Sequence, residues 1–274
     1  MKAKWWKYNF EELTYYRFSI YHFGMNMQTV YLYRFGEHLV DTAQRNSREN
    51  IDVITEGRSI KNIFLTHYHE DHTGNAAYLQ KINNAKIFAH PICAEMMTKG
   101  FTVSPLGRLI SGNVSKAVVN SMADGEVVDL DNYQLQAIYT PGHTNDHTAF
   151  YEKSRGWLFS GDIYVADRIK YFESNEDIKE QIKSLKKLVA LDFDVLFCAH
   201  NPKLKGGKKR LERKLELFES FYNEVLRLNT QGLDDNEILK ALGRKENFFY
   251  KFMTVGHFTA VNMVKSVLKA EGRL

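Results

Sequence analysis

The stretch FLTHYHEDHTGN, residues 64–75, places three histidines, a glutamate and an aspartate within six positions, directly after an apolar run. A protein core accepts so many ionisable groups only when they are paired or bound to a metal. A surface loop has no need of them. The fold must therefore bring these side chains to one point, and the candidate metal ligands here are His67, His69, Asp71 and His72.

Three later segments have the same arrangement, in which a strand-like apolar run is followed by a metal-ligating residue type. His143 follows LQAIYT and the turn Pro-Gly, Asp162 follows WLFSG, and His200 follows VLFCA. The ends of strands give a rigid base, and the loops after them can bring distant residues together. We therefore expect these three side chains to join the first cluster.

The spacing H-x-H-x-D-H favours a site for two ions. Residues two apart in extended backbone point to the same side, so His67 and His69 can bind one ion together. After the chain turns, Asp71 and His72 can face a second ion. Imidazole and carboxylate ligands suit zinc, iron or manganese, and ion pairs about 3.5–4 Å apart occur in hydrolases. We predict two divalent ions, with zinc favoured and iron or manganese as alternatives.

Strand-like and helix-like segments alternate along the chain, which favours a layered α/β (α+β) fold. Helical spacing of apolar residues predicts a helix over 174–191, capped by Ser174 or Asn175. A second helix is expected over 75–82. The strand-like runs are 29–43, with a hairpin turn at 35–38, and 60–66, 85–90, 133–140, 156–162 and 193–201.

The composition changes after Asn201. Residues 202–214 are basic and contain two glycines, 215–228 form an amphipathic helical pattern, and 234–242 and 258–270 are further helix candidates. We predict a catalytic domain over 1–207 and a helical C-terminal domain over 208–274. Trp5 and Trp6 are expected in the core, and the aromatic N-terminus could cover a sheet edge or the surface of a partner, which leaves a homodimer open.

The composition limits the function classes. A net charge of +4 in 274 residues is mildly basic, so it does not require a nucleic-acid partner. Two cysteines, Cys93 and Cys198, fit a reducing compartment better than a disulfide framework. We see no signal peptide and no apolar run near the roughly 20 residues of a membrane-spanning helix. We predict a cytoplasmic protein with no membrane partner.

The segments THYHEDHTGN, TPGHT, FSGD and FCAHN resemble the successive metal-binding motifs of the metallo-β-lactamase superfamily, and most closely its glyoxalase-II-like hydrolases. The resemblance implies a four-layer αββα sandwich, with two central sheets covered by helices and a dinuclear site at one edge. It also implies that Asp162 bridges two ions, the first held by His67, His69 and His143 and the second by Asp71, His72 and His200.

Other positions also resemble residues near the family's site. Asp41 is similar to an aspartate that contacts the ligand histidines, although a simple strand-end turn would explain it equally well. His147 is read as structural. By itself, a lone histidine is expected on the surface or in a satisfied core, and this reading is applied to His22, His38, His90 and His257.

The resemblance implies hydrolysis, in which a water bridging the two ions loses a proton and attacks the substrate. Asp71 is the candidate catalytic residue that orients this water and moves its proton. A histidine at position 69 disfavours the flavodiiron branch, which has glutamate there. Asp162 argues against antibiotic hydrolysis, because true β-lactamases usually lack this aspartate.

The expected substrate is a small ester, thioester or lactone. Glyoxalase II proteins commonly have tyrosine two residues after the last ligand histidine, where this chain has Pro202. Lactonases commonly have tyrosine three residues after the bridging aspartate, where this chain has Val165. The segment after Asp162 is expected to line the pocket through Tyr164, Arg168, Tyr171 and Phe172.

The alternative is a phosphodiesterase or endoribonuclease of the same superfamily. The basic segment 203–214 could bind the phosphates of RNA. Residues 256–274 are also similar to the winged-helix-like tail of a ribonuclease-like branch, although a solvated loop and a packing appendage explain both features. A regulator that holds metal without catalysis is a third possibility.

Overall fold

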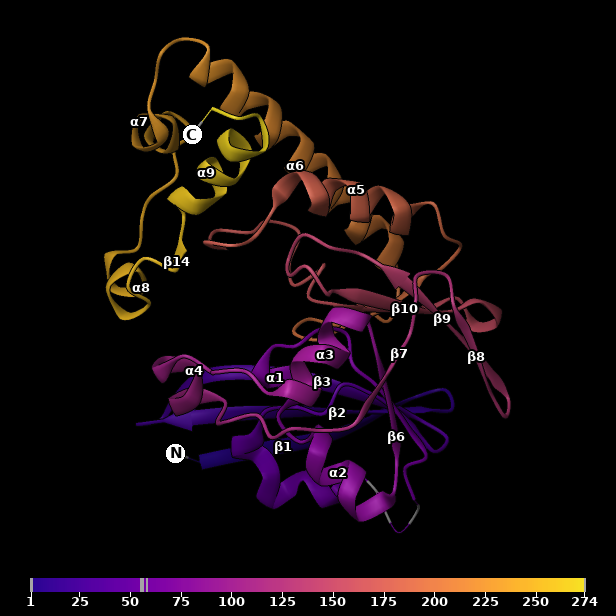
Figure 1. Cartoon of the computed structure of the whole chain (residues 1–274). Helices are drawn as coiled ribbons and strands as arrows, with labels where there is room; N and C mark the ends of the chain where they lie inside the picture. Colours follow the sequence, from indigo (N-terminus) through magenta and orange to yellow (C-terminus); the bar gives the residue numbers. More distant parts are fainter. Residues whose placement is uncertain (1, 55–56, 58, 274) are drawn as a thin grey trace.

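The computed structural model describes residues 2–54, 57 and 59–273, and a seven-stranded sheet occupies its first half (Figure 1). The first four strands pair antiparallel and the last four pair parallel. In spatial order, which is also chain order, the strands are β1 (Lys2–Phe10), β2 (Leu13–His22), β3 (Met25–Phe35), β4 (His38–Val40), β5 (Asn62–Phe64), β6 (Lys86–Ala89) and β7 (Val119–Ser121).

A five-stranded sheet follows in the second half of the chain. Its spatial order is β13 (Val195–Cys198), β11 (Trp157–Gly161), β10 (Thr148–Glu152), β9 (Tyr133–Tyr139) and β8 (Val127–Leu130). Only β11 and β13 pair parallel. Consequently β9, β11 and β13 all run in the same direction and end at the same edge of the sheet. A separate pair joins β12 (Phe172–Glu173) to β14 (Phe258–Thr259).

The helices fall into two groups along the chain. Before the second sheet lie α1 (Glu70–Thr73), α2 (Ala76–Asn83), α3 (Pro91–Lys99), α4 (Pro105–Ile110) and the 3₁₀ segment Arg45–Ile54. Residues 153–155 form a further 3₁₀ turn within the second sheet. The other helices are α5 (Ile178–Val189), α6 (Gly207–Asn229), α7 (Asp235–Ala241), α8 (Phe248–Met253) and α9 (Val261–Ala270).

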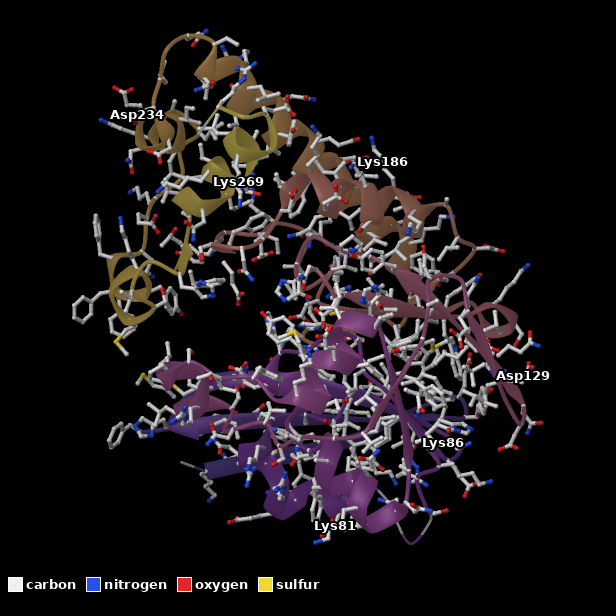
Figure 2. All side chains as sticks on the ribbon, in the orientation of Figure 1. Lys81, Lys86, Asp129, Lys186, Asp234 and Lys269 are labelled. Carbon is white, nitrogen blue, oxygen red and sulfur yellow. The ribbon has the colours of Figure 1, made fainter. Side chains whose placement is uncertain are left out.

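The side-chain alternation of the strands builds four layers. In β2, Tyr15 faces the second sheet and packs in one core with Phe150, whereas Tyr16 faces the opposite side and packs with Leu79 of α2. The outer face of the second sheet packs against α5 and α6 through a third cluster. Figure 2 shows Lys81 of α2 and Lys186 of α5 on opposite outer sides of the molecule. The predicted αββα sandwich is confirmed.

Of the C-terminal helices, α6 packs on β13 of the second sheet, and α9 packs on α5 and α6. Leu211 of α6 and Val264 of α9 share a buried cluster with Leu185 of α5. At the start of α6, a Cβ on Gly207 would lie 2.5 Å from Leu196 Cβ, so glycine lets the helix approach β13 closely. The division of the chain at residue 207 stays a prediction.

Several details differ from the sequence-based expectations. Helix α5 is capped by Asp177, whose Oδ1 accepts from Glu180 N at 3.0 Å, and not by Ser174 or Asn175. Helix α6 begins at Gly207 and not at 215, while residues 258–259 form β14 before α9. Trp5 is 38% exposed, and Trp6 is half-buried, because both lie on β1, the edge strand. Their assignment to the core was wrong.

Among the described residues, no helix combines the length and apolar character needed to cross a lipid bilayer.

Candidate metal centre

The structure brings all seven predicted ligands together in three overlapping groups, within each of which the ligand atoms lie within 4.8 Å of one another. The outer groups match the two ion sets inferred from the sequence motifs. The middle group lies between them and contains Asp162. The groups are His67, His69 and His143; His67, His72 and Asp162; and Asp71, His72 and His200.

Strand ends place these residues, as expected. His143, Asp162 and His200 follow β9, β11 and β13, which end at one edge, and His67 follows β5 of the other sheet. The two sheets meet here because Thr148 N donates to Thr66 O at 2.8 Å. Helix α1 then turns the chain and brings Asp71 and His72 back to the cluster.

Two glycines let the chain pass through this crowded edge. Gly161 has a φ of 48°, and a Cβ there would lie 2.6 Å from His147 Nε2. Gly142 has a φ of 128°, and its Cβ would lie 2.4 Å from Gln181 N of α5. Both backbone conformations favour glycine. The Pro-Gly turn can therefore rest on α5 and present His143.

The donor atoms of the cluster fit a metal. His67 Nε2, His72 Nε2 and Asp162 Oδ1 are buried and have no hydrogen-bond partner among the described residues. Unsatisfied buried polar atoms of this kind are rare and costly. Imidazole nitrogens and carboxylate oxygens are also the ligands of divalent transition metals. The arrangement therefore suits two divalent ions, and the roles of the individual ligands stay predictions.

A cavity of about 680 Å³ opens onto the cluster. Five of the predicted ligands line it: His69, Asp71, His143, Asp162 and His200. Its walls come from the segment before α4, from residues 165–176, and from His257 and Phe258 after α8. A small molecule can therefore reach the cluster.

Comparisons with known proteins agree with this geometry. The sequence profile described as Metallo-beta-lactamase superfamily matches residues 27–200, more than half of the chain. The chain belongs to the metallo-beta-lactamase superfamily. The matched range contains every predicted ligand of the cluster and ends at His200.

Two relatives resemble this superfamily chain at modest identity, and one of them is named as a hydrolase. A hydroxyacylglutathione hydrolase of Hahella chejuensis is 32% identical over 146 residues, covering 52% of this chain and 48% of the relative. This alignment spans about half the length of the relative. A beta-lactamase-like protein 2 homolog of Caenorhabditis elegans is 25% identical over 237 residues, which cover 84% of this chain and 73% of the relative.

A solved structure shares nearly the whole superfamily fold with this chain. A metallo-beta-lactamase family protein from Thermus thermophilus superposes with a TM-score of 0.68 at 21% identity. The match covers 96% of this chain and 95% of that one. At this identity the likeness shows the fold alone, and it includes the C-terminal helices.

In the group Asp71, His72 and His200, residues outside the cluster orient both histidines. His72 Nδ1 lies 2.8 Å from Asp41 Oδ2, and His200 Nδ1 donates to Thr29 O at 2.6 Å. Each contact leaves Nε2 free to face the cluster. Burial by itself would lower the pKa of His72, but the carboxylates of Asp162, Asp71 and Asp41 outweigh it and raise that pKa well above its ordinary value.

Asp41 therefore does more than end a strand, because it also accepts from Thr66 N at 2.9 Å. We expect Asp41→Asn to weaken metal binding about 10- to 100-fold through loss of the charge behind His72. Asparagine tolerates the φ of 61° at this position, so the backbone should stay in place. Competition with a chromophoric zinc chelator measures the change. Asp131→Asn, an exposed site with a φ of 52°, is the matched control, and equal affinities of both variants would contradict the role.

The sequence analysis missed two glutamates that contact the first group. Glu176 Oε2 lies 3.4 Å from His143 Nδ1, and Glu173 Oε2 lies 3.7 Å from His69 Nε2. Burial would raise the pKa of Glu173, but a hydrogen bond from His257 and the charges of His69 and His143 lower it to about 2. For His143 the directions are reversed. Burial would lower its pKa, but the hydrogen bond and the charge of Glu176 raise it to about 9.

The C-terminal helices hold the segment that carries these glutamates. Ser266 Oγ of α9 donates to Glu176 O at 2.9 Å, and Asn262 Nδ2 donates to Phe172 O at 3.1 Å. His257 Nε2 lies 3.5 Å from Glu173 Oε2, so this histidine borders the site and is not an isolated surface residue. The one sequence signal was an acidic pair, three residues apart, that follows Asp162.

We expect Glu176→Gln to weaken metal binding at the first group about tenfold, because a neutral amide supports the His143 ring less well than a carboxylate. The same chelator competition, with the metal content of the dialysed protein, measures this effect. Glu180→Gln is the control, since Glu180 pairs with Lys183 on the exposed face of α5. Wild-type affinity in the Glu176 variant would refute the contact's importance.

Two of the four predicted pocket residues line the cavity, and the other two lie in the core. Arg168 and Tyr171 line the cavity. Tyr164 does not, because it is buried in the helical core, where its hydroxyl donates to Asp167 Oδ1 at 2.6 Å. Phe172 is also buried in that core. Aromatic residues after a strand could not be divided between pocket and core without the packing of α6.

Three of the remaining histidines, His147, His38 and His90, have structural partners. His147 Nδ1 lies 2.8 Å from Thr140 Oγ1, and its Nε2 accepts from Asp162 N at 3.1 Å, so it fixes the backbone of the middle group. His38 lies 3.0 Å from the Asn62 amide nitrogen. His90 caps α3 by accepting from Ile92 N. These placements agree with a structural reading of all three.

Proposed function

We propose that the chain is a dinuclear metal-dependent hydrolase that cleaves a small ester, thioester or lactone. The observation that carries the proposal is that buried ligand atoms of His67, His72 and Asp162 have no hydrogen-bond partner among the described residues, in a cluster that opens onto a cavity of about 680 Å³. The names of the hydroxyacylglutathione hydrolase relatives support a hydrolytic reaction on a thioester-like bond.

His67, His69 and His143 would hold the first ion, and Asp71, His72 and His200 the second, with Asp162 shared between them. Zinc is favoured, and iron or manganese would accept the same ligands. Two such ions supply Lewis acidity, which polarises a carbonyl and makes water a nucleophile at neutral pH.

Asp71 is proposed to orient the attacking water and to accept its proton. The carboxylate lines the cavity, and its Oδ2 lies 3.5 Å from His200 Nε2 and 3.8 Å from His72 Nε2. It is thus placed where substrate and ligands meet, as a general base requires. Asp41, Glu173 and Glu176 act through the histidines they contact and are positioning residues.

Two positions at which this sequence differs from glutathione thioesterases and lactonases limit the choice of substrate. Pro202 and Val165 stand where glutathione thioesterases and lactonases commonly have tyrosine. A small-molecule partner is therefore proposed without choosing among ester, thioester and lactone. A cytoplasmic location is supported by two free, buried cysteines, Cys93 and Cys198. Membrane independence and a homodimer stay expectations.

The nuclease alternative has weaker support. In the basic segment, Arg210 Nη1 lies 2.8 Å from Asp167 Oδ2 and Arg213 Nη1 lies 3.1 Å from Glu216 Oε2. Lys214 is buried. Fewer cations are then free to bind phosphates than the sequence suggested. Ion pairs and burial disfavour a strip of cations that would follow an RNA backbone.

A reporter panel separates the two functions. We expect protein purified without chelators to contain about two transition-metal ions per chain, and to cleave aryl ester, thioester or lactone reporters. Binding to single-stranded RNA should be weak and nearly independent of salt. Elemental analysis, hydrolysis rates and RNA titrations at two salt concentrations measure these outcomes. Tight RNA binding that falls steeply with salt would favour the nuclease, and absence of metal would refute the central proposal.

A further inference from the structure

Lys214 of α6 is a buried cation beside the candidate metal centre. The residue is 1% exposed, and its Nζ donates to Ile163 O at 2.7 Å, the carbonyl directly after Asp162. Its ammonium also lies 4.8 Å from the ring centroid of Phe218. Lys214 lines the same cavity as Asp162 and His200.

The ammonium is incompletely satisfied by the protein. A lysine has three N–H donors, and Lys214 uses one of them in its single hydrogen bond with the described residues. None of those residues places a carboxylate within ion-pair distance of its Nζ, that is, within 4.0 Å. Burying a charge without a partner is costly, and a carbonyl alone could be capped by a neutral side chain. The charge therefore indicates a partner that enters through the cavity.

Opposing effects act on the pKa of Lys214. Burial lowers its pKa to about 8, while the more distant carboxylates of Glu176 and Asp162 oppose the shift. The group can act as a cation in a site shielded from bulk water, where charge-assisted hydrogen bonds are strong.

Two exposed cations, Arg168 and Lys170, also line the cavity. Arg168 and Lys170 also have no carboxylate within ion-pair distance among the described residues. Outside the cavity, by contrast, Arg210 and Arg213 are paired with acids. Three cations therefore border the cavity without an ion pair, while the lining glutamates Glu173 and Glu176 are engaged with histidines.

We propose that Lys214 binds an anionic group of the substrate, a carboxylate or a phosphate, with Arg168 and Lys170 attracting it into the cavity. The inference rests on the proposed hydrolase function and narrows its substrate class. The substrate is an ester or thioester that carries a negative charge in its acyl or leaving group. Lys214 is a specificity residue for that charge.

Matched reporters test the proposal. Three aryl esters are compared: 4-nitrophenyl acetate is neutral, mono-4-nitrophenyl succinate has a carboxylate in its acyl group, and 4-acetoxyphenyl phosphate has a phosphate in its leaving group. We expect at least one anionic ester to have a lower KM than the acetate. Lys214→Gln should raise that KM about tenfold and change the KM of the acetate less than twofold, because glutamine can still donate to Ile163 O but carries no charge. The arm that responds identifies carboxylate or phosphate.

Two further variants keep the test decisive. Lys209→Gln, an exposed site on the same helix, should leave all three KM values unchanged. If Lys214→Gln fails to fold, Lys214→Met replaces it, since an apolar side chain can pack against Phe218 without a buried charge. An equal change of KM for neutral and anionic esters, or no change, would overturn the proposal.

Direct binding separates this inference from the proposed function. Calorimetric titration with succinate and with inorganic phosphate needs no turnover, and we expect Lys214→Gln to weaken the tighter of the two about tenfold. If the wild type cleaves none of the esters but shows this Lys214-dependent binding, hydrolysis of such esters is refuted and the anion site stands. If neither anion depends on Lys214, the anion site is refuted.

Discussion

Replacing Asp162 with asparagine should lower kcat/KM for ester hydrolysis at least about a thousandfold. Asp162 Oδ2 lies 3.2 Å from His200 Nε2 and 3.7 Å from His143 Nε2, and its Oδ1 lies 3.5 Å from His72 Nε2. Its carboxylate thus faces both proposed ion sites. An amide keeps the shape but loses the charge and one acceptor oxygen. Losing roughly 4 kcal/mol of transition-state stabilisation corresponds to that factor.

Steady-state kinetics together with elemental analysis of the same preparation measure this effect. We expect the metal content of the variant to fall below two ions per chain. Asp129→Asn, on the exposed β8, is the control and should behave as wild type. Full activity of the Asp162 variant would remove the bridging role and, with it, the dinuclear mechanism.

Removing metal should lower the melting temperature by about 10 °C. Without ions, the buried carboxylates and imidazoles of the three groups face one another, and His67 Nε2 and His72 Nε2 have no hydrogen-bond partner among the described residues. A ligand present at a thousand times its Kd stabilises the native state by about 4 kcal/mol. For a chain of this size that free energy corresponds to a shift of roughly 10 °C.

Thermal denaturation before and after chelation, and again after zinc is restored, checks this expectation. Zinc should return most of the lost stability to the wild type and less of it to Asp162→Asn. The outcome that would count against the centre is a melting temperature that does not respond to chelator or to zinc.

The ligand set could be predicted from the sequence because each member follows a strand end within a few residues. Local patterns such as WLFSG before Asp162 determine both the strand and the point where the chain leaves the sheet.

The rest depended on contacts between distant segments. Glu173 contacts a histidine because β12, which it ends, pairs with β14. Glu176 does so because α9 supports the segment between β12 and α5. No local pattern encodes a pairing across more than eighty residues. Trp5 illustrates a different limit: an aromatic strand pattern is the same on an edge strand as in a central one, and only the sheet order distinguishes them.

The hydrogen bonds between α9 and the segment that carries Glu176 affect the position of His143. Ser266 Oγ accepts from Ile178 N at 2.9 Å and donates to Glu176 O at 2.9 Å. One hydroxyl of α9 thus holds the backbone on both sides of residue 177, and the Glu176 carboxylate contacts His143. Loosening of the last helix would be transmitted to the imidazole through these contacts. Helix α9 would therefore help to fix the position of His143, although the candidate metal ligands lie more than sixty positions earlier in the sequence.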